Sequence, residues 1–124
     1  MQGDSGRTAE ALFEGCPAGL AACREVAAAV AALGDHAVRV SKTQVAFHAA
    51  RRGFAYVWRP DRVGHPVAPA VLSVALPRQV PSARFREVVQ LRAGLWMHHL
   101  LLTGAADVDA EVRGWLAEAY DAAG

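Results

Sequence analysis

The stretch RRGFAYVW, Arg51–Trp58, contains a turn followed by a strand, and the placement of its three aromatic rings decides the fold. Phe54, Tyr56 and Trp58 alternate with alanine and valine, which is the period of a β-strand. Each ring can bury ~150–250 Å², and the chain has few other large residues for a core. We therefore expect all three rings on one buried face. The alternative is that they form an exposed surface on which bases stack.

The same stretch partly matches the signature of RNA-recognition domains, K/R-G-F/Y-G/A-F-V-x-F/Y. Residues 52–57 fit its first six places if tyrosine is accepted as the second aromatic, but Arg59 occupies the eighth place, where an aromatic residue belongs. In an RNA-recognition domain a helix follows this strand. Here the chain continues into another strand pattern, so the order of elements excludes that fold.

The segments before this strand predict a helix and two strands. Apolar residues recur at helical spacing over residues 17–33, with a proline in the first turn and Gly34 after the last, and residues 9–13 suggest a helical turn of their own. From residue 36 the period changes to two. Residues 38–47 then predict two strands joined by a tight turn or bulge at residues 41–43.

The segments after it complete an α+β domain. Residues 71–76 and 96–102 predict two more strands, and a short helix capped by Ser82 is expected over residues 82–90. A final amphipathic helix is expected from about residue 107 to residue 122. We thus expect a five-stranded antiparallel meander sheet, with the N- and C-terminal helices on one face and a short helix before the last strand. Residues 1–7 are expected to be a disordered lead, and residues 8–124 a single domain.

Length and hydropathy narrow the class of protein. A chain of 124 residues suits one domain. No window approaches the run of about 18 uncharged apolar residues that spans a membrane, and the N-terminus does not resemble a signal peptide, so we expect a cytoplasmic protein with no membrane partner. Cys16 and Cys23 would lie about 10 Å apart on one helix, too far for a disulfide, and their spacing fits no metal site.

Charge is distributed unevenly along the chain. Residues 36–99 hold ten of the 13 lysines and arginines, all five histidines and two of the 12 acidic residues, whereas both flanking segments are acidic. This pattern favours a basic sheet beside acidic helices. The ratio of twelve arginines to one lysine, with abundant alanine, is also typical of a GC-rich genome.

Polar residues in the basic block form a candidate anion site. Lys42 stands at the expected turn, where a lysine, a hydroxyl and an amide can together hold a phosphate or carboxylate; the alternative is an exposed, solvated turn. His98 and His99 are adjacent in a strand and therefore point to opposite faces, so one of them is expected at the site and no metal ion is expected to bind both. The candidate ligand-binding residues are Arg39, Lys42, Thr43, Gln44, His98 and His99, and the arginines of a surrounding basic rim are Arg51, Arg52 and Arg92. The alternative for the rim is pairing with the acidic helices.

Catalytic motifs are scarce in the chain. It contains no G-x-S-x-G, P-loop or paired-cysteine motif, and no cofactor is expected. With two acids in the basic block, a general base would have to be a histidine. A nucleophile such as Ser41 or Thr43 would need His48 or His98 beside it, and no sequence pattern places them together.

A resemblance to a known family covers nearly the whole chain from about Leu12. Five segments carry it: LFEGCP, VRVSKTQVAFHARRGFAYVW, PRQVPSARFREVV, LWMHHLLL and DVDAEVRGWLAEAYDAA. They resemble a family of small bacterial domains catalogued as domain of unknown function 5655. The resemblance implies a small α+β domain, found alone or appended to other domains, and implies no activity.

The sequence therefore predicts a small binding module for an anionic ligand on a basic sheet surface. The ligand would be a phosphate- or carboxylate-bearing molecule or a nucleic-acid backbone. The first alternative is a protein-interaction or homodimerisation module in which the basic sheet meets an acidic helix. The second is an enzyme that depends on a histidine of the last strand.

Overall fold

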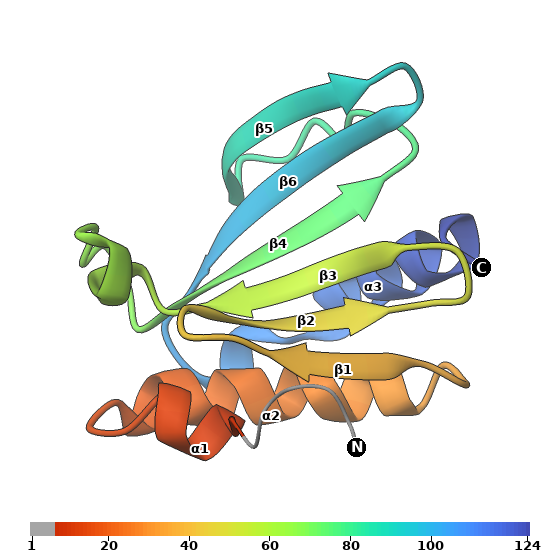
Figure 1. The fold of residues 1–124 in the computed structure, drawn as a ribbon. Coiled ribbons are helices and arrows are strands. Elements are labelled where there is room, and N and C mark those ends of the chain that lie inside the picture. Colours follow the sequence, from red (N-terminus) through yellow and green to blue (C-terminus); the bar gives the residue numbers. More distant parts are fainter. Residues whose placement is uncertain (1–6) are drawn as a thin grey trace.

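The computed structural model describes residues 7–124; the first six residues of the expected lead lie outside the described part (Figure 1). In chain order the elements are α1 (Ala9–Leu12), α2 (Pro17–Ala31), β1 (Ala37–Val40), β2 (Gln44–His48), β3 (Gly53–Trp58), the 3₁₀ helix η1 (Pro60–Val63), β4 (Ala70–Leu76), β5 (Phe85–Arg92), β6 (Leu95–Leu102), the 3₁₀ helix η2 (Ala105–Asp107) and α3 (Ala110–Ala122).

The strands form one antiparallel sheet in the order β1-β2-β3-β4-β6-β5 (Figure 1). The sheet has six strands where five were expected. It is also not a simple meander, because β6 pairs with both β4 and β5 and leaves β5 at the edge. The additional strand occupies the segment for which we expected a short helix.

The predicted helix over residues 82–90 is wrong for a physical reason. The pairing of β5 with β6 shifts register between Phe85 and Glu87 and again between Gln90 and Arg92. Each irregularity interrupts the alternation of inward and outward side chains, so the sequence does not show the period of two. Two adjacent valines in this segment nevertheless favour a strand, because β-branched side chains fit a pleated surface.

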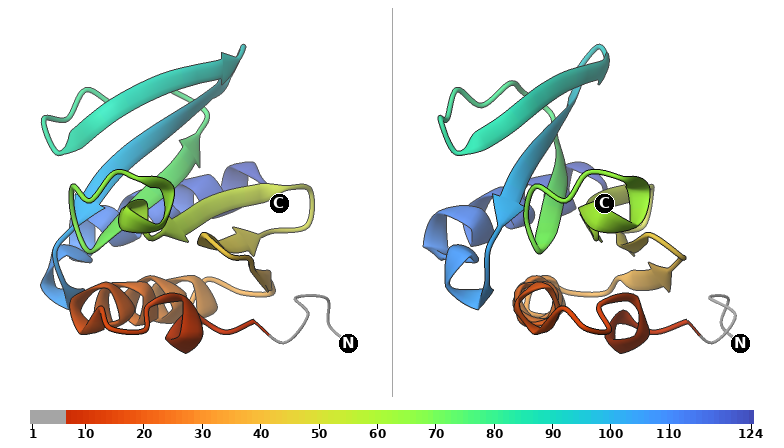
Figure 2. Two further views of the ribbon diagram at one scale, coloured as in Figure 1. Left: turned by 60° about the vertical axis from the view of Figure 1, so that its left-hand side comes forward. Right: turned by 90° about the vertical axis from the view of Figure 1, so that its left-hand side faces the viewer.

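The helices α2 and α3 pack against the same face of the sheet, and α1 lies beside α2 (Figure 2). From β4, Leu72 and Val74 belong to the core cluster with Val26 of α2 and Leu116 of α3, and all four side chains are essentially inaccessible. Asp109 caps the start of α3, because its carboxylate accepts a hydrogen bond from the amide of Val112. One face of the sheet is therefore covered by helices, and we call the opposite side the open face.

A bulge in β3 separates the three aromatic rings. His48 pairs with Gly53, but Phe47 pairs with Ala55, so Phe54 is an extra residue in β3. The Phe54 ring is fully buried on the helix-covered side, where it meets Tyr120 edge-on at 5.5 Å between ring centres.

Beyond the bulge, Tyr56 and Trp58 return to the alternation and lie on the open face. Trp58 there contacts Ser73, which does not belong to the helix-covered core. Gly53 accommodates this arrangement, because a Cβ atom at that position would collide with the Tyr56 hydroxyl. The prediction that all three rings share one buried face is wrong.

Several arginines of the basic block pair with acids rather than forming a basic surface. Arg84 bonds Asp109 and Glu111 at the start of α3, and Arg78 bonds Glu118 in the same helix. These contacts join the basic segment to an acidic helix within one molecule. The expected rim arginines Arg51, Arg52 and Arg92 take no part in them, and within residues 7–124 none of the three forms an ion pair.

Replacing Phe54 by alanine should lower the free energy of unfolding by about 3–5 kcal/mol, the usual cost of removing a buried aromatic ring. Tyr56→Ala should cost clearly less, because the Tyr56 ring lies on the open face and is only partly buried. Urea unfolding of both variants measures the difference. Equal losses would contradict the bulge, because they would place both rings in the same environment.

Candidate functional site

The structure separates the six predicted binding residues into distinct places. Lys42 lines a cavity beside α1, whereas Gln44 and His99 line the open face. Arg39 is exposed on the edge strand β1, and His98 is buried in the core. Thr43 serves the β1–β2 turn, where its carbonyl accepts a hydrogen bond from the amide of Arg59. The predicted residues therefore do not form one site.

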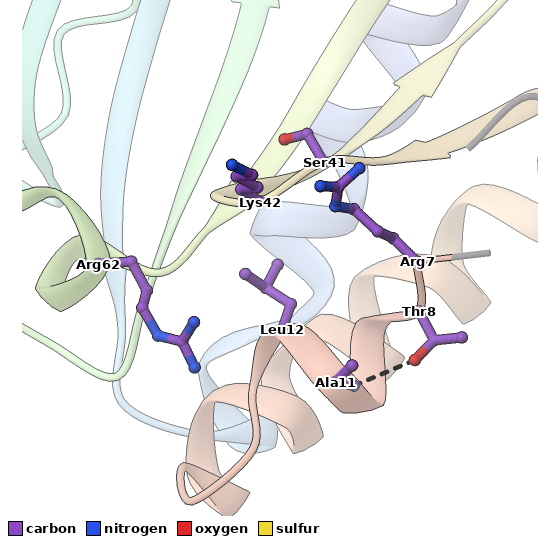
Figure 3. A pocket seen from close by; sticks show the side chains of 7 residues that line it. All are labelled: Arg7, Thr8, Ala11, Leu12, Ser41, Lys42 and Arg62. Carbon is purple, nitrogen blue, oxygen red and sulfur yellow. Dashed lines mark hydrogen bonds between the residues drawn. The ribbon is translucent and has the colours of Figure 1, made fainter. Parts of the chain in front are cut away.

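The Lys42 cavity has a volume of about 260 Å³ and is formed by three segments that are distant in sequence (Figure 3). Its lining residues are Arg7, Thr8, Ala11, Leu12, Ser41, Lys42 and Arg62. Figure 3 shows the three cationic side chains placed around Leu12, which reaches up between them. Within residues 7–124, none of these three cations forms an ion pair. We call this feature the cationic cavity.

Two hydroxyl groups of the cationic cavity hold its backbone in place. Ser41 Oγ accepts hydrogen bonds from the amides of Thr43 and Gln44 at 3.3 and 3.2 Å, which fixes the tight turn that presents Lys42. Thr8 Oγ accepts from the amide of Ala11 at 3.1 Å and caps α1. These hydroxyls shape the cavity, and the cations supply its charge.

Arg59 fixes the remaining walls of the cationic cavity. Its guanidinium donates to both carboxylate oxygens of Asp61 in η1, at 2.7 and 3.2 Å. It also donates to the carbonyls of Leu12 and Glu14, at 3.0 and 2.7 Å, which have no partner within the short helix α1. The bond to Arg59 lowers the pKa of Asp61 below its usual value. Arg59 thus ties η1, which carries Arg62, to the end of α1.

The open face contains two adjoining cavities that share Trp58 and His99. The smaller, of about 350 Å³, is lined by Gln44, Tyr56, Trp58, Ser73, Met97 and His99. The larger, of about 410 Å³, is lined by Trp58, His65, Val67, Val71, Arg86, Glu87, His99 and Leu101. In the described part of the chain, neither cavity shares a lining residue with the cationic cavity.

Hydrogen bonds connect three side chains across the open face. The indole Nε1 of Trp58 donates to Ser73 Oγ at 3.0 Å, and Ser73 Oγ lies 2.7 Å from Nδ1 of His99. Ser73 is 4% exposed. Burial lowers the pKa of His99, and the nearby charge of Glu87 partly opposes that shift.

The second histidine is part of the core. Nε2 of His98 accepts a hydrogen bond from the amide of Val80 at 3.0 Å, which leaves Nδ1 to donate to the carbonyl of Trp96 at 3.1 Å. The ring also meets Phe85 at 4.7 Å between ring centres. Burial lowers its pKa. Of the two predicted histidines, only His99 is placed to meet a ligand.

The predicted rim arginines lie away from the cationic cavity. Arg51 and Arg52 occupy the β2–β3 turn, at the opposite end of β2 from Lys42, and Arg92 ends the edge strand β5. The amide of Arg51 donates to the carbonyl of Ala123, which attaches this turn to the end of α3. These residues do not form a rim around Lys42.

Sequence reasoning did not find the open-face network or the role of Arg7. Ser73 was detectable, because it is the one polar residue in the apolar strand β4. Arg7 gave no signal, since the other two cations of the cavity, Lys42 and Arg62, come from distant parts of the chain.

Within residues 7–124, no three histidine, cysteine or acidic side chains lie close enough together to hold a metal ion. None of the helices in the same residues is long and apolar enough to cross a membrane.

Burial raises the pKa of the Cys23 thiol to about 12, so this cysteine behaves as a core residue.

Comparisons with known proteins give one match. The model of a family described as "Domain of unknown function (DUF5655)" matches residues 9–123, which is nearly the whole described chain. No curated protein and no solved structure matches the chain.

The buried state of His98 should make stability depend on pH. Because burial lowers the pKa in the folded chain, the unfolded chain binds more protons below about pH 6.5, the ordinary value. The stability contributed by neutral His98 is therefore complete above that pH and is lost as the pH falls towards the folded-state pKa. His99 acts in the same direction.

In His98→Gln the loss of unfolding free energy between about pH 7.5 and about pH 5.5 should be smaller than in the wild type, whatever the variant's absolute stability. Urea unfolding at the two pH values measures it. An identical loss in both proteins would show that His98 does not titrate as its burial requires.

Proposed function

This chain belongs to the DUF5655 family of domains of unknown function, and we propose that it binds a small anionic molecule in the cationic cavity. The observation that carries the proposal is the convergence of Arg7, Lys42 and Arg62, from three separate segments, on a cavity of about 260 Å³ (Figure 3). Like charges gathered in one place repel one another, and the attraction of a bound anion to each of them offsets that repulsion.

The side chains around the cavity suit an oxyanion. The planar guanidinium of an arginine can bond two oxygens of a phosphate or carboxylate at once, and the lysine adds a compact charge with three donors. Leu12, which is 5% exposed, contributes an apolar floor. Apolar surroundings strengthen a charge-assisted hydrogen bond, because less water competes for the same groups.

The size of the cavity and the pairing of other arginines favour a small molecule over a nucleic-acid backbone. The volume lies just below the usual range for ligand sites, about 300–1,000 Å³. A nucleic acid needs an extended basic surface, but Arg59, Arg78 and Arg84 of the basic block are bonded to acids. The preferred ligand is thus a small phosphate- or carboxylate-bearing molecule.

The homodimerisation alternative rests on a different feature of the fold. The edge strand β5 exposes Val89 and Leu91, at 38% and 53%. An exposed apolar edge strand can pair with another chain. This alternative stays a prediction.

Inorganic phosphate, pyrophosphate and citrate should each raise the melting temperature at low salt, and less so at about 0.15 M salt. Lys42→Ala and Arg62→Ala should each weaken binding about tenfold or more, since each removes a charge-assisted hydrogen bond of about 1.5–3 kcal/mol. Calorimetric titration of the same anions measures the affinities.

Arg39→Ala is the matched control, because Arg39 is an exposed arginine that does not line the cavity. It should bind the anions as the wild type does. The proposal fails if no anion shifts the melting temperature, or if Lys42→Ala and Arg62→Ala lose no more affinity than Arg39→Ala.

A further inference from the structure

A fixed chain of hydrogen bonds on the open face lies outside the cationic cavity. It links Trp58, Ser73 and His99, and none of them lines the cationic cavity. From it we infer that the open face is a second binding site, which takes a planar, uncharged heteroaromatic ring of the nucleobase type. This inference does not depend on the proposed anion site.

The shape of the open face provides space for such a ring. The sheet twists so that the β5–β6 hairpin turns away from β1–β3 (Figure 2). His65 and Val67, from the loop after η1, line one part of the larger cavity, and Arg86 and Glu87 of β5 line another. Both cavities have volumes within the usual range for small-molecule sites.

The hydrogen bonds of Ser73 determine which nitrogen of His99 carries the proton and can donate it to a ligand. An indole N–H can only donate, so Ser73 Oγ accepts from Trp58. Ser73 has one hydrogen of its own, and its other contact within residues 7–124 is Nδ1 of His99. Ser73 therefore donates to Nδ1, and the imidazole proton resides on Nε2. In the same residues Nε2 has no hydrogen-bond partner, so it is an available donor.

The other lining groups match a flat heterocycle. Trp58 and Tyr56 are partly buried rings on the same face, and the bond from Nε1 holds the indole in one orientation. Bases stack on such rings with little regard to sequence. The Gln44 amide, which can donate and accept, lies in the same cavity as His99. A ring edge that carries acceptors and donors can therefore bond both the Gln44 amide and Nε2 of His99.

The charge of the open face favours a neutral ligand over an anion. His99 is held in its neutral form by burial. The larger cavity contains Arg86 but also Glu87, so its charges offset one another. In the cationic cavity, by contrast, every charged lining residue among residues 7–124 is positive. The two sites therefore select ligands of different chemistry.

The Ser73–His99 contact does not form a nucleophile site. Ser73 lies in the middle of β4, whose residues pair with β3 on one side and with β6 on the other. Its neighbouring backbone amides are thus used in the sheet, and none remains to stabilise an oxyanion. Ser73 also accepts the indole N–H, so its role is to orient Trp58 and His99.

The test uses adenosine, guanosine, cytidine and uridine as probes of the ¹⁵N-labelled protein. At about 10 mM, well above a Kd of about 1 mM, at least one nucleoside should shift the indole resonance of Trp58 and the side-chain amide of Gln44. Trp58→Leu should weaken binding about tenfold or more, because it removes a stacking ring. Ser73→Ala keeps every ring and should weaken binding several-fold.

Lys42→Ala is the control, since it changes only the cationic cavity. It should bind nucleosides as the wild type does, so loss of anion binding and loss of nucleoside binding can be told apart. The inference is overturned if no nucleoside shifts the open-face resonances. It is also overturned if Ser73→Ala and a folded Trp58→Leu variant both bind like the wild type.

Discussion

One extra residue in β3 determines what each face of the domain can do. The bulge places Phe54 under the helices, where it packs against Tyr120, and returns Tyr56 and Trp58 to the opposite face. Without it, strict alternation would put all three rings on one side. With Ala55 and Val57 still in the core, Phe54 would then join Tyr56 and Trp58 on the open face, and the core would lose the ring that packs against Tyr120. The bulge therefore accounts for a buried core and a structured open face within the same strand.

Arginine serves two purposes in this small fold. Arg59, Arg78 and Arg84 join segments together. Arg78 and Arg84 bond acids of α3 or its N-cap, and Arg59 bonds carbonyls at the end of α1. Arg7 and Arg62, with Lys42, form no ion pair within the described residues and surround a cavity. The uneven charge along the sequence therefore reflects pairing between segments as much as a basic surface, and the anion site that we propose uses only cations without an ion pair in the described residues.

Local patterns predicted the elements whose period is regular. The helices α2 and α3 and the strands β1, β2, β3, β4 and β6 follow from apolar spacing, and the family match is confirmed. The strand β5 was missed because two irregularities hide its alternation, and the bulge at Phe54 was missed because it exists only in the pairing with β2. The alternation of side chains along a strand placed His98 and His99 on opposite faces, but only the packing shows which one is buried. The cationic cavity joins distant segments, so no local pattern could predict it.

The most direct test of the hydrogen-bond chain on the open face is to determine the tautomer of His99 from the ¹⁵N resonances of its imidazole ring at neutral pH. The hydrogen bonds from Trp58 through Ser73 require a neutral ring with its proton on Nε2 and Nδ1 as an acceptor. That result would establish that the open face presents a fixed donor. A ring protonated on Nδ1, or a charged ring, would contradict the arrangement, because Ser73 would then have to receive two hydrogen bonds and leave its own hydrogen without a partner.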